Sequence, residues 1–177
     1  MGRDLQDGAM DRAELQAVQK PLKDRYREEP AAALVTLRAD GQLDEEQIAC
    51  RVETGRALVE AGLHPATGGT GALACSGDML LEALVACAGV TLRSVATSME
   101  LDVSGSVHAE GDLDFRGTLG VDREAPVGFA AIRLRFDLAS DASKEELDKL
   151  LERTERYCVV FQTLAGGVPV EITYSSS

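Results

Sequence analysis

The sequence predicts an α+β protein built from an antiparallel sheet and two principal helices. Three observations carry this prediction. Residues 77–99 are apolar on every side of a helical projection. Several other segments alternate apolar and polar residues with a period of two, as strands with one solvated face do. These segments follow the order strands, helix, strands, helix, strand, and the length of 177 residues corresponds to about one domain.

The N-terminal third divides into an arm and a group of short strands. Residues 1–30 are polar with helical spacing of their few apolar positions, so we expect an N-terminal helical arm, followed by one domain over 31–177. We predict a strand over 33–38 and a turn at 39–41. Further strands follow over 47–54 and 56–61, and a glycine-rich loop covers 62–74.

Residues 77–99 form the most distinctive segment of the chain. From Met79 onward its only charges are Glu82 and Arg93. A helix that is apolar all round is a buried helix, and at 1.5 Å per residue this one is roughly 30 Å long. One small sheet cannot cover it on all faces, so a second subunit is its simplest cover, and we expect a homodimer.

The remaining elements follow from local patterns. Residues 101–115 alternate with a period of two and predict a long antiparallel strand, or two strands joined at Gly111. Residues 117–128 predict a loop, and 132–138 another strand. Ser143 and Glu146 fit a capping box that opens a second helix. Cys158 lies eleven residues after Leu147 and therefore on the same, inward face of that helix. Residues 168–174 predict a terminal strand.

Composition excludes several classes of function. The net charge is −12, which disfavours nucleic-acid and membrane partners, and aromatic residues make up only 4%. The N-terminus lacks the apolar run of a signal peptide. From the sequence, we expect no stretch to reach the roughly 18–20 apolar residues of a membrane span. The four cysteines form no C-x-x-C pair and have no histidine at zinc-ligand spacing. We expect a cytoplasmic protein without a metal.

Two cysteines are candidates for redox chemistry. Cys87 lies in the apolar helix beside small residues that leave room for a ligand, and Cys158 points inward from the second helix. Buried cysteines are most often packing residues, so composition alone leaves this alternative open for both.

The residues around these cysteines resemble a known family. The segment GDMLLEALVAC, residues 77–87, resembles the cysteine helix of the family of osmotically inducible protein C (OsmC) and the organic hydroperoxide resistance proteins (Ohr). The segment YCVVFQTL, residues 157–164, resembles its second cysteine box. The glycine-rich loop at 68–71 also matches, as does the separation of 71 positions between the cysteines. The resemblance covers about residues 33–174, and residues 1–30 resemble an extension found in a divergent subgroup.

The resemblance implies both a fold and an activity. The fold is an intertwined homodimer in which antiparallel sheets wrap around two long central helices. The activity is peroxiredoxin-like reduction of organic hydroperoxides, with Cys87 as the peroxidatic thiolate and Cys158 as the resolving thiol. An external dithiol, such as a dihydrolipoyl group, is the implied reductant, and no cofactor or metal is implied.

The family activates its cysteine with an arginine held by a carboxylate. Asp78 is the nearest counterpart of that carboxylate, although it could instead be the N-cap of the helix. Arg56 is the best candidate for the arginine, with Arg51 second. Either arginine could simply be a solvated strand residue.

Other readings remain open at this point. Cys75, next to the helix N-terminus, is a rival nucleophile, and His64 and His108 are expected to have structural or surface roles. The alternative functions are a non-catalytic dimer that binds an apolar small molecule beside Cys87, and another thiol enzyme that handles disulfides or thioesters.

Overall fold

The structure, a computed structural model, describes residues 11–29, 40–43, 49–53, 58–120 and 122–176, and its mixture of helices and strands confirms the α+β class. In chain order the elements are α1 (Arg12–Glu28), β1 (Asp40–Leu43), β2 (Ala49–Glu53), β3 (Leu58–Gly62), the 3-10 turn η2 (Pro65–Thr67), β4 (Ala74–Cys75), α2 (Ser76–Ser98), β5 (Ser104–Leu113), α3 (Phe115–Thr118), β6 (Phe129–Ala139), α4 (Lys144–Tyr157) and α5 (Val159–Gly166).

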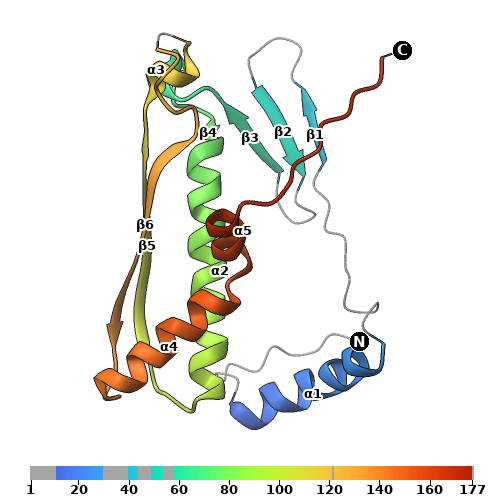
Figure 1. Cartoon of the computed structure of the whole chain (residues 1–177), viewed down its shortest axis with the longest axis vertical. Coiled ribbons are helices and arrows are strands. Elements are labelled where there is room, and N and C mark those ends of the chain that lie inside the picture. The colour runs from blue at the N-terminus through green and yellow to red at the C-terminus, as the bar shows by residue number, and fades with distance from the viewer. Residues whose placement is uncertain (1–10, 30–39, 44–48, 54–57, 121, 177) are drawn as a thin grey trace.

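The strands form two separate sheets. The first has the order β1-β2-β3-β4, and the second is the long hairpin β5-β6, which runs along α2 in Figure 1. The pairs β1-β2, β2-β3 and β5-β6 are antiparallel, as predicted, whereas β3 and β4 are parallel. The expectation of an antiparallel sheet is therefore corrected at β4. The loop after β3 leads the chain back to the start of β3, so that β4 runs in the same direction as β3.

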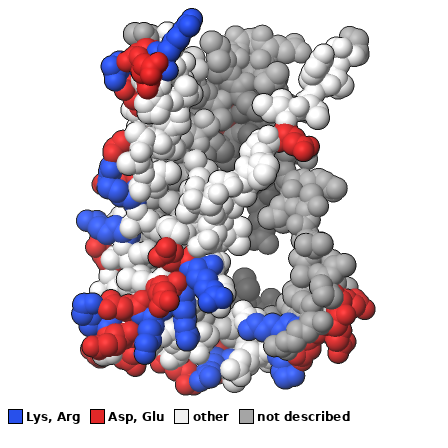
Figure 2. All heavy atoms as spheres, in the orientation of Figure 1, with Lys and Arg blue, Asp and Glu red and all other residues white. Residues whose placement is uncertain are grey.

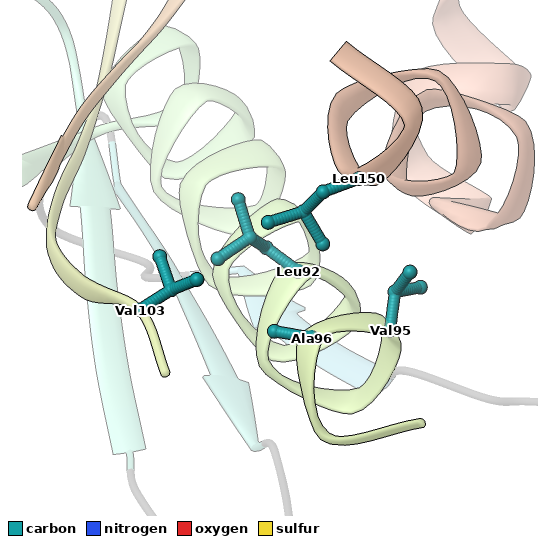
Figure 3. Close-up of a cluster of buried hydrophobic side chains, with 5 residues drawn as sticks. All are labelled: Leu92, Val95, Ala96, Val103 and Leu150. Carbon is teal, nitrogen blue, oxygen red and sulfur yellow. The ribbon is translucent and has the colours of Figure 1, made fainter. Parts of the chain in front are cut away.

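Helix α2 is the central element, and the described elements bury only one face of it. Its buried residues are Leu84, Ala88, Leu92, Val95 and Ala96. The last three of them pack with Val103 and Leu150, which are 1% and 0% exposed, in the cluster shown in Figure 3. The opposite face stays open, and Val90 is 72% exposed. The all-round burial predicted for this helix is thus not achieved within one chain.

Helix α4 begins where the sequence predicts. The Glu146 N–H donates to Ser143 Oγ at 3.3 Å, and the Ser143 N–H donates back to Glu146 Oε2 at 2.9 Å, so the capping box is formed. The apolar stripe of α4 then lies against α2, with Leu150 and Thr154 buried. Thr154 satisfies its hydroxyl by donating to the Leu150 carbonyl at 2.8 Å.

Helix α1 corresponds to the predicted N-terminal arm. Arg12 Nη1 lies 2.7 Å from Glu100 Oε2, which joins the start of α1 to the end of α2. The division of the chain at residue 30 remains a prediction, and the strand predicted over 33–38 lies outside the described residues.

Three local predictions are wrong. Asp40 and Gly41 belong to β1, paired with Glu53 and Val52, and do not form a turn. The loop predicted over 117–128 starts with the end of α3. Residues 168–174 form no strand, and Ile172 is 93% exposed. A strand requires a neighbour to complete its hydrogen bonds, and no described strand pairs with this segment.

The apolar character of α2 also corrects the expectation about membrane-length segments. By length and composition α2 could cross a membrane, with a mean hydropathy of 1.6 in its most apolar window. The core helix of a soluble protein has the same composition, and α2 packs against β5, α4 and α5. We therefore assign α2 to the core.

The packing around α2 yields a stability prediction. Leu150 is fully buried between α4 and α2, so Leu150→Ala should lower the free energy of unfolding by about 2–5 kcal/mol. Urea unfolding followed by circular dichroism measures the change. Leu119→Ala is the control, because Leu119 is 55% exposed and should change stability little. Equal losses in the two variants would contradict this account of the core.

Candidate active site

The site is built at the break between α4 and α5. Cys158 ends α4 and also begins α5, with extended backbone angles of φ −74° and ψ 107°. Its side chain is 1% exposed, so the predicted inward position is confirmed. The break turns the chain so that the N-terminus of α5 lies against α2, as Figure 1 shows. The first amides of α5 have no partner within their own helix and are free to bind another acceptor.

That acceptor is the Cys87 sulfur. Cys87 is half-buried on α2, and its sulfur receives hydrogen bonds from the Val160 N–H, the Cys158 thiol, the Val159 N–H and the Thr91 hydroxyl. Burial is the largest single influence and raises the pKa of Cys87. The four hydrogen bonds together outweigh burial, so the pKa of Cys87 is lowered.

Cys158 shifts in the opposite direction. Burial raises the pKa of the Cys158 thiol most, and the neighbouring Cys87 raises it further, while the Phe161 and Val160 amides lower it in part. The Cys158 thiol therefore keeps its proton and donates it in a hydrogen bond to the Cys87 sulfur. The two cysteines titrate as a pair in which Cys87 loses its proton first.

The two cysteines differ in exposure and in how readily they ionise. The more accessible cysteine is the one whose anion is stabilised, and the protonated cysteine is buried against it. Neither is in a disulfide, and they are in hydrogen-bonding contact from two different helices. The structure thus brings together two of the four predicted site residues.

Of the other two predicted site residues, the structure describes only Asp78. Arg56, and the side chain of its rival Arg51, lie outside the described residues, so both remain predictions. Asp78 is exposed in the first turn of α2. Nine residues at 100° each place it on the opposite side of the helix from Cys87. The alternative role of Asp78 as N-cap is wrong, because Cys75 occupies that position.

Asp78 instead lines a second cavity, of about 350 Å³, with His64 and Cys75. His64 has a structural role there: its Nδ1 accepts from the Ala66 N–H at 3.0 Å, and its ring stacks on Phe115 at 4.8 Å. Cys75 makes no side-chain cap hydrogen bond. Neither Cys87 nor Cys158 is among the described residues that line this cavity.

Two further observations limit the chemistry. His108 is exposed on β5, where its Nε2 lies 2.8 Å from Ser106 Oγ. Among the described residues, no three histidine, cysteine or acidic side chains are grouped closely enough to hold a metal ion.

Sequence reasoning missed the helix that supplies the two amides. From the sequence, we expected the second helix to extend to Cys158 and expected no new helix after it. The signal was present in the spacing of Val160, Phe161 and Leu164, which repeats as one face of a helix does, and in Gly167, which ends that helix.

Comparison with known proteins identifies the family of the chain. The sequence profile of the OsmC family, described as OsmC-like protein, matches residues 69–173. No curated protein matches the chain significantly.

Solved structures share its fold. An OsmC-like protein from Mycoplasma pneumoniae has a TM-score of 0.62 at 17% identity, over 75% of this chain and 89% of that one. An organic hydroperoxide resistance protein from Elizabethkingia anophelis, with thiocyanate bound, has a TM-score of 0.57 at 16% identity, over 76% and 91%. A protein from Legionella pneumophila, described as an organic hydroperoxide resistance protein OsmC, has a TM-score of 0.55 at 18% identity, over 76% and 92%.

The hydroxyl of Thr91 gives a direct test of the site. Thr91→Val removes one hydrogen bond to the Cys87 anion and should raise the pKa of Cys87. At neutral pH, alkylation of Cys87 by iodoacetamide should then slow by roughly two- to fivefold, the effect of one modest hydrogen bond. The difference should vanish at high pH, where both proteins are fully thiolate. Thr91→Ser should keep the wild-type profile; a Thr91→Ser profile like that of Thr91→Val would show that the methyl group matters instead.

Proposed function

The chain belongs to the OsmC-like protein family, and on this premise we propose that it reduces organic hydroperoxides with Cys87 as the peroxidatic thiolate and Cys158 as the resolving thiol. One observation carries the proposal. The Cys158 thiol donates to the Cys87 sulfur, and two amides of α5 also lower the pKa of Cys87. The organic hydroperoxide resistance proteins that share this fold support the same class of reaction.

The chemistry follows from the protonation of the pair. The Cys87 thiolate attacks the terminal peroxide oxygen, the O–O bond breaks, and the alkoxide takes up a proton and leaves as alcohol. Cys87 is now a sulfenic acid. The sulfur of Cys158 attacks it, forming the disulfide, and the proton of Cys158 leaves with the hydroxide as water. An external dithiol, of dihydrolipoyl type, then restores both thiols by exchange and is itself oxidised to a disulfide.

The organic part of the peroxide has a place beside the pair. A cavity of about 320 Å³ is lined by Leu84, one turn before Cys87 on α2, by Phe161 and Leu164 of α5, and by residues of β6. Its apolar walls suit an alkyl or aryl group. The same cavity is the observation that favours the second candidate function, a non-catalytic dimer that holds an apolar molecule beside Cys87.

Arg56 and Asp78 enter this mechanism as proposals. The two amides and the Thr91 hydroxyl already lower the pKa of Cys87 without a cation. Arg56 would strengthen the same effect if its guanidinium reaches Cys87, and Asp78 would act only by holding such an arginine. The localisation that fits reduced thiols and an external dithiol is the cytoplasm.

The disulfide is the decisive intermediate. One equivalent of cumene hydroperoxide added to the reduced protein should link Cys87 to Cys158 within one chain and release one equivalent of alcohol. Peptide mapping by mass spectrometry identifies the bridge. Cys158→Ser should stop the reaction at the Cys87 sulfenic acid, which dimedone traps.

Cys75→Ser is the matched control and should form the same bridge at the same rate. Oxidation of Cys75 with Cys87 left as a thiol would transfer the nucleophile to the other cavity. Saturable binding of the peroxide with no oxidation of Cys87 would favour the non-catalytic binder.

We also propose that the protein is a homodimer in which a second copy covers the open face of α2. Ala83, Ala86 and Val90 are exposed on this face although α2 is strongly apolar. Closing it against another chain would remove these side chains from water. It would also offer a neighbour to residues 168–174 and allow the sheets of two chains to wrap around a pair of α2 helices.

Sedimentation equilibrium tests the dimer. The measured mass should be twice the 18.8 kDa of one chain, and the buried interface of such an obligate dimer should exceed about 2,000 Å². Val90→Glu places a charge in that interface and should shift the protein toward monomer. Lys144→Glu changes an exposed residue at the start of α4 and should leave the dimer intact. A wild-type protein that stays monomeric and active at micromolar concentration would overturn the proposal.

A further inference from the structure

The break between α4 and α5 is spanned by one side chain. Cys158 closes α4, because its N–H donates to the Thr154 carbonyl at 2.9 Å. Its own carbonyl opens α5 by accepting from the Gln162 N–H at 2.9 Å. The side chain of Gln162 turns back across the break, and its Nε2 donates to the Glu155 carbonyl at 2.9 Å. This hydrogen bond, the Gln162 tie, joins the first turn of α5 to the last turn of α4.

The tie occupies a carbonyl that another amide would occupy in an unbroken helix. In an α-helix each carbonyl accepts from the N–H four residues later, so the Glu155 carbonyl would accept from the Val159 N–H. The Val160 N–H would bind the next carbonyl in the same way. Here both amides donate to the Cys87 sulfur instead. The Nε2 of Gln162 therefore takes the place that the Val159 amide has left at the Glu155 carbonyl.

A single backbone torsion separates the broken helix from a continuous one. Cys158 has a φ of −74°, close to the helical value of about −63°. Only its ψ of 107° departs from the helical value of about −42°. Rotation about that torsion would join α4 and α5 into one helix. The Val159 and Val160 amides would then bond to carbonyls of α4 and would be lost to the Cys87 sulfur.

The Gln162 tie can form only in the broken arrangement. Gln162 follows Glu155 by seven residues, which corresponds to about 10 Å along the axis of a continuous helix. That separation exceeds the reach of a glutamine side chain, so the hydrogen bond would break if the two helices joined. The tie therefore favours the arrangement in which the α5 amides face Cys87.

We propose that Gln162 is a positioning residue, which keeps α4 and α5 apart at Cys158 so that the first amides of α5 stay directed at the Cys87 sulfur. The packing of α5 on α2 places the helix beside Cys87, and the tie sets the residue at which the helix begins. A role of Gln162 in peroxide reduction rests on the proposed function; its effect on the Cys87 thiol does not.

The surroundings of the tie allow a test that changes no charge. Helix α5 contains no charged residue, and the part of the surface where it lies is white in Figure 2, whereas charged side chains gather lower in the view, over α1 and α4. Gln162→Met keeps the length of an exposed side chain but removes the donor. Thr163→Val is the matched control, because it removes a polar group from the exposed surface of α5 and leaves the tie in place.

The first experiment follows the alkylation of Cys87 by iodoacetamide against pH in the reduced protein. Loss of the tie should raise the pKa of Cys87, because in part of the molecules the α5 amides would be bonded within the joined helix. At neutral pH, Gln162→Met should therefore react roughly two- to fivefold more slowly, the effect of one exposed hydrogen bond. The difference should vanish at high pH, where Cys87 is fully ionised in both proteins.

Thr163→Val should keep the wild-type pH profile. A Gln162→Met profile identical to that of the wild type would overturn the proposal, as would an equal slowing in Thr163→Val. Thermal unfolding of the same proteins separates positioning from stability. A lower melting temperature in Gln162→Met with an unchanged pH profile would show that the tie serves stability alone, and would also overturn the proposal.

The second experiment observes the torsion at Cys158. The ¹³Cα and ¹³Cβ chemical shifts of a residue report whether its backbone is extended or helical, and they are measured at a pH at which Cys87 is a thiol. The wild type and Thr163→Val should show the shifts of an extended Cys158. In Gln162→Met these shifts should move toward helical values. Extended shifts in all three proteins would overturn the proposal.

Both measurements use the reduced protein without peroxide. Suppose that Gln162→Met changes them as expected, but that the wild type forms no Cys87–Cys158 disulfide with cumene hydroperoxide: the positioning role then stands and the proposed function fails. If the disulfide forms and Gln162→Met behaves as the wild type in both measurements, the proposed function stands and the positioning role fails.

Discussion

The structure depends on one constraint, the need to cover a 23-residue helix that is apolar on every side. Each element that packs on α2 brings a functional consequence with it. The β5-β6 hairpin and α4 cover the face that contains Leu92 and Ala96. To cover the next stretch of α2, the chain breaks at Cys158 and lays α5 against it. Packing therefore places the second thiol and two amides of α5 beside Cys87, and the thiol site results from the way in which the core is closed.

The break at Cys158 answers an electrostatic problem. Burial denies the Cys87 thiolate part of the hydration that would stabilise it, and this raises the pKa. Cys87 also lies in the middle of its own helix, too far from the N-terminus of α2 for the dipole of that helix to help. The sequence led us to look for an arginine. The described residues offer instead the N-terminus of a different helix, whose Val159 and Val160 amides point at the sulfur. Backbone donors need no recognisable residue type, and this is why the sequence did not reveal them.

The sequence predicts those features that a local pattern fixes. The apolar run of α2, the alternation of β5 and β6, and the Ser143–Glu146 capping box each specify an element within one short segment, and each is confirmed. The inward position of Cys158 followed from helical phase alone. The terminal strand failed for the opposite reason. Residues 168–174 have a suitable alternation, but a strand forms only against a neighbour, and the pattern does not say which chain supplies it.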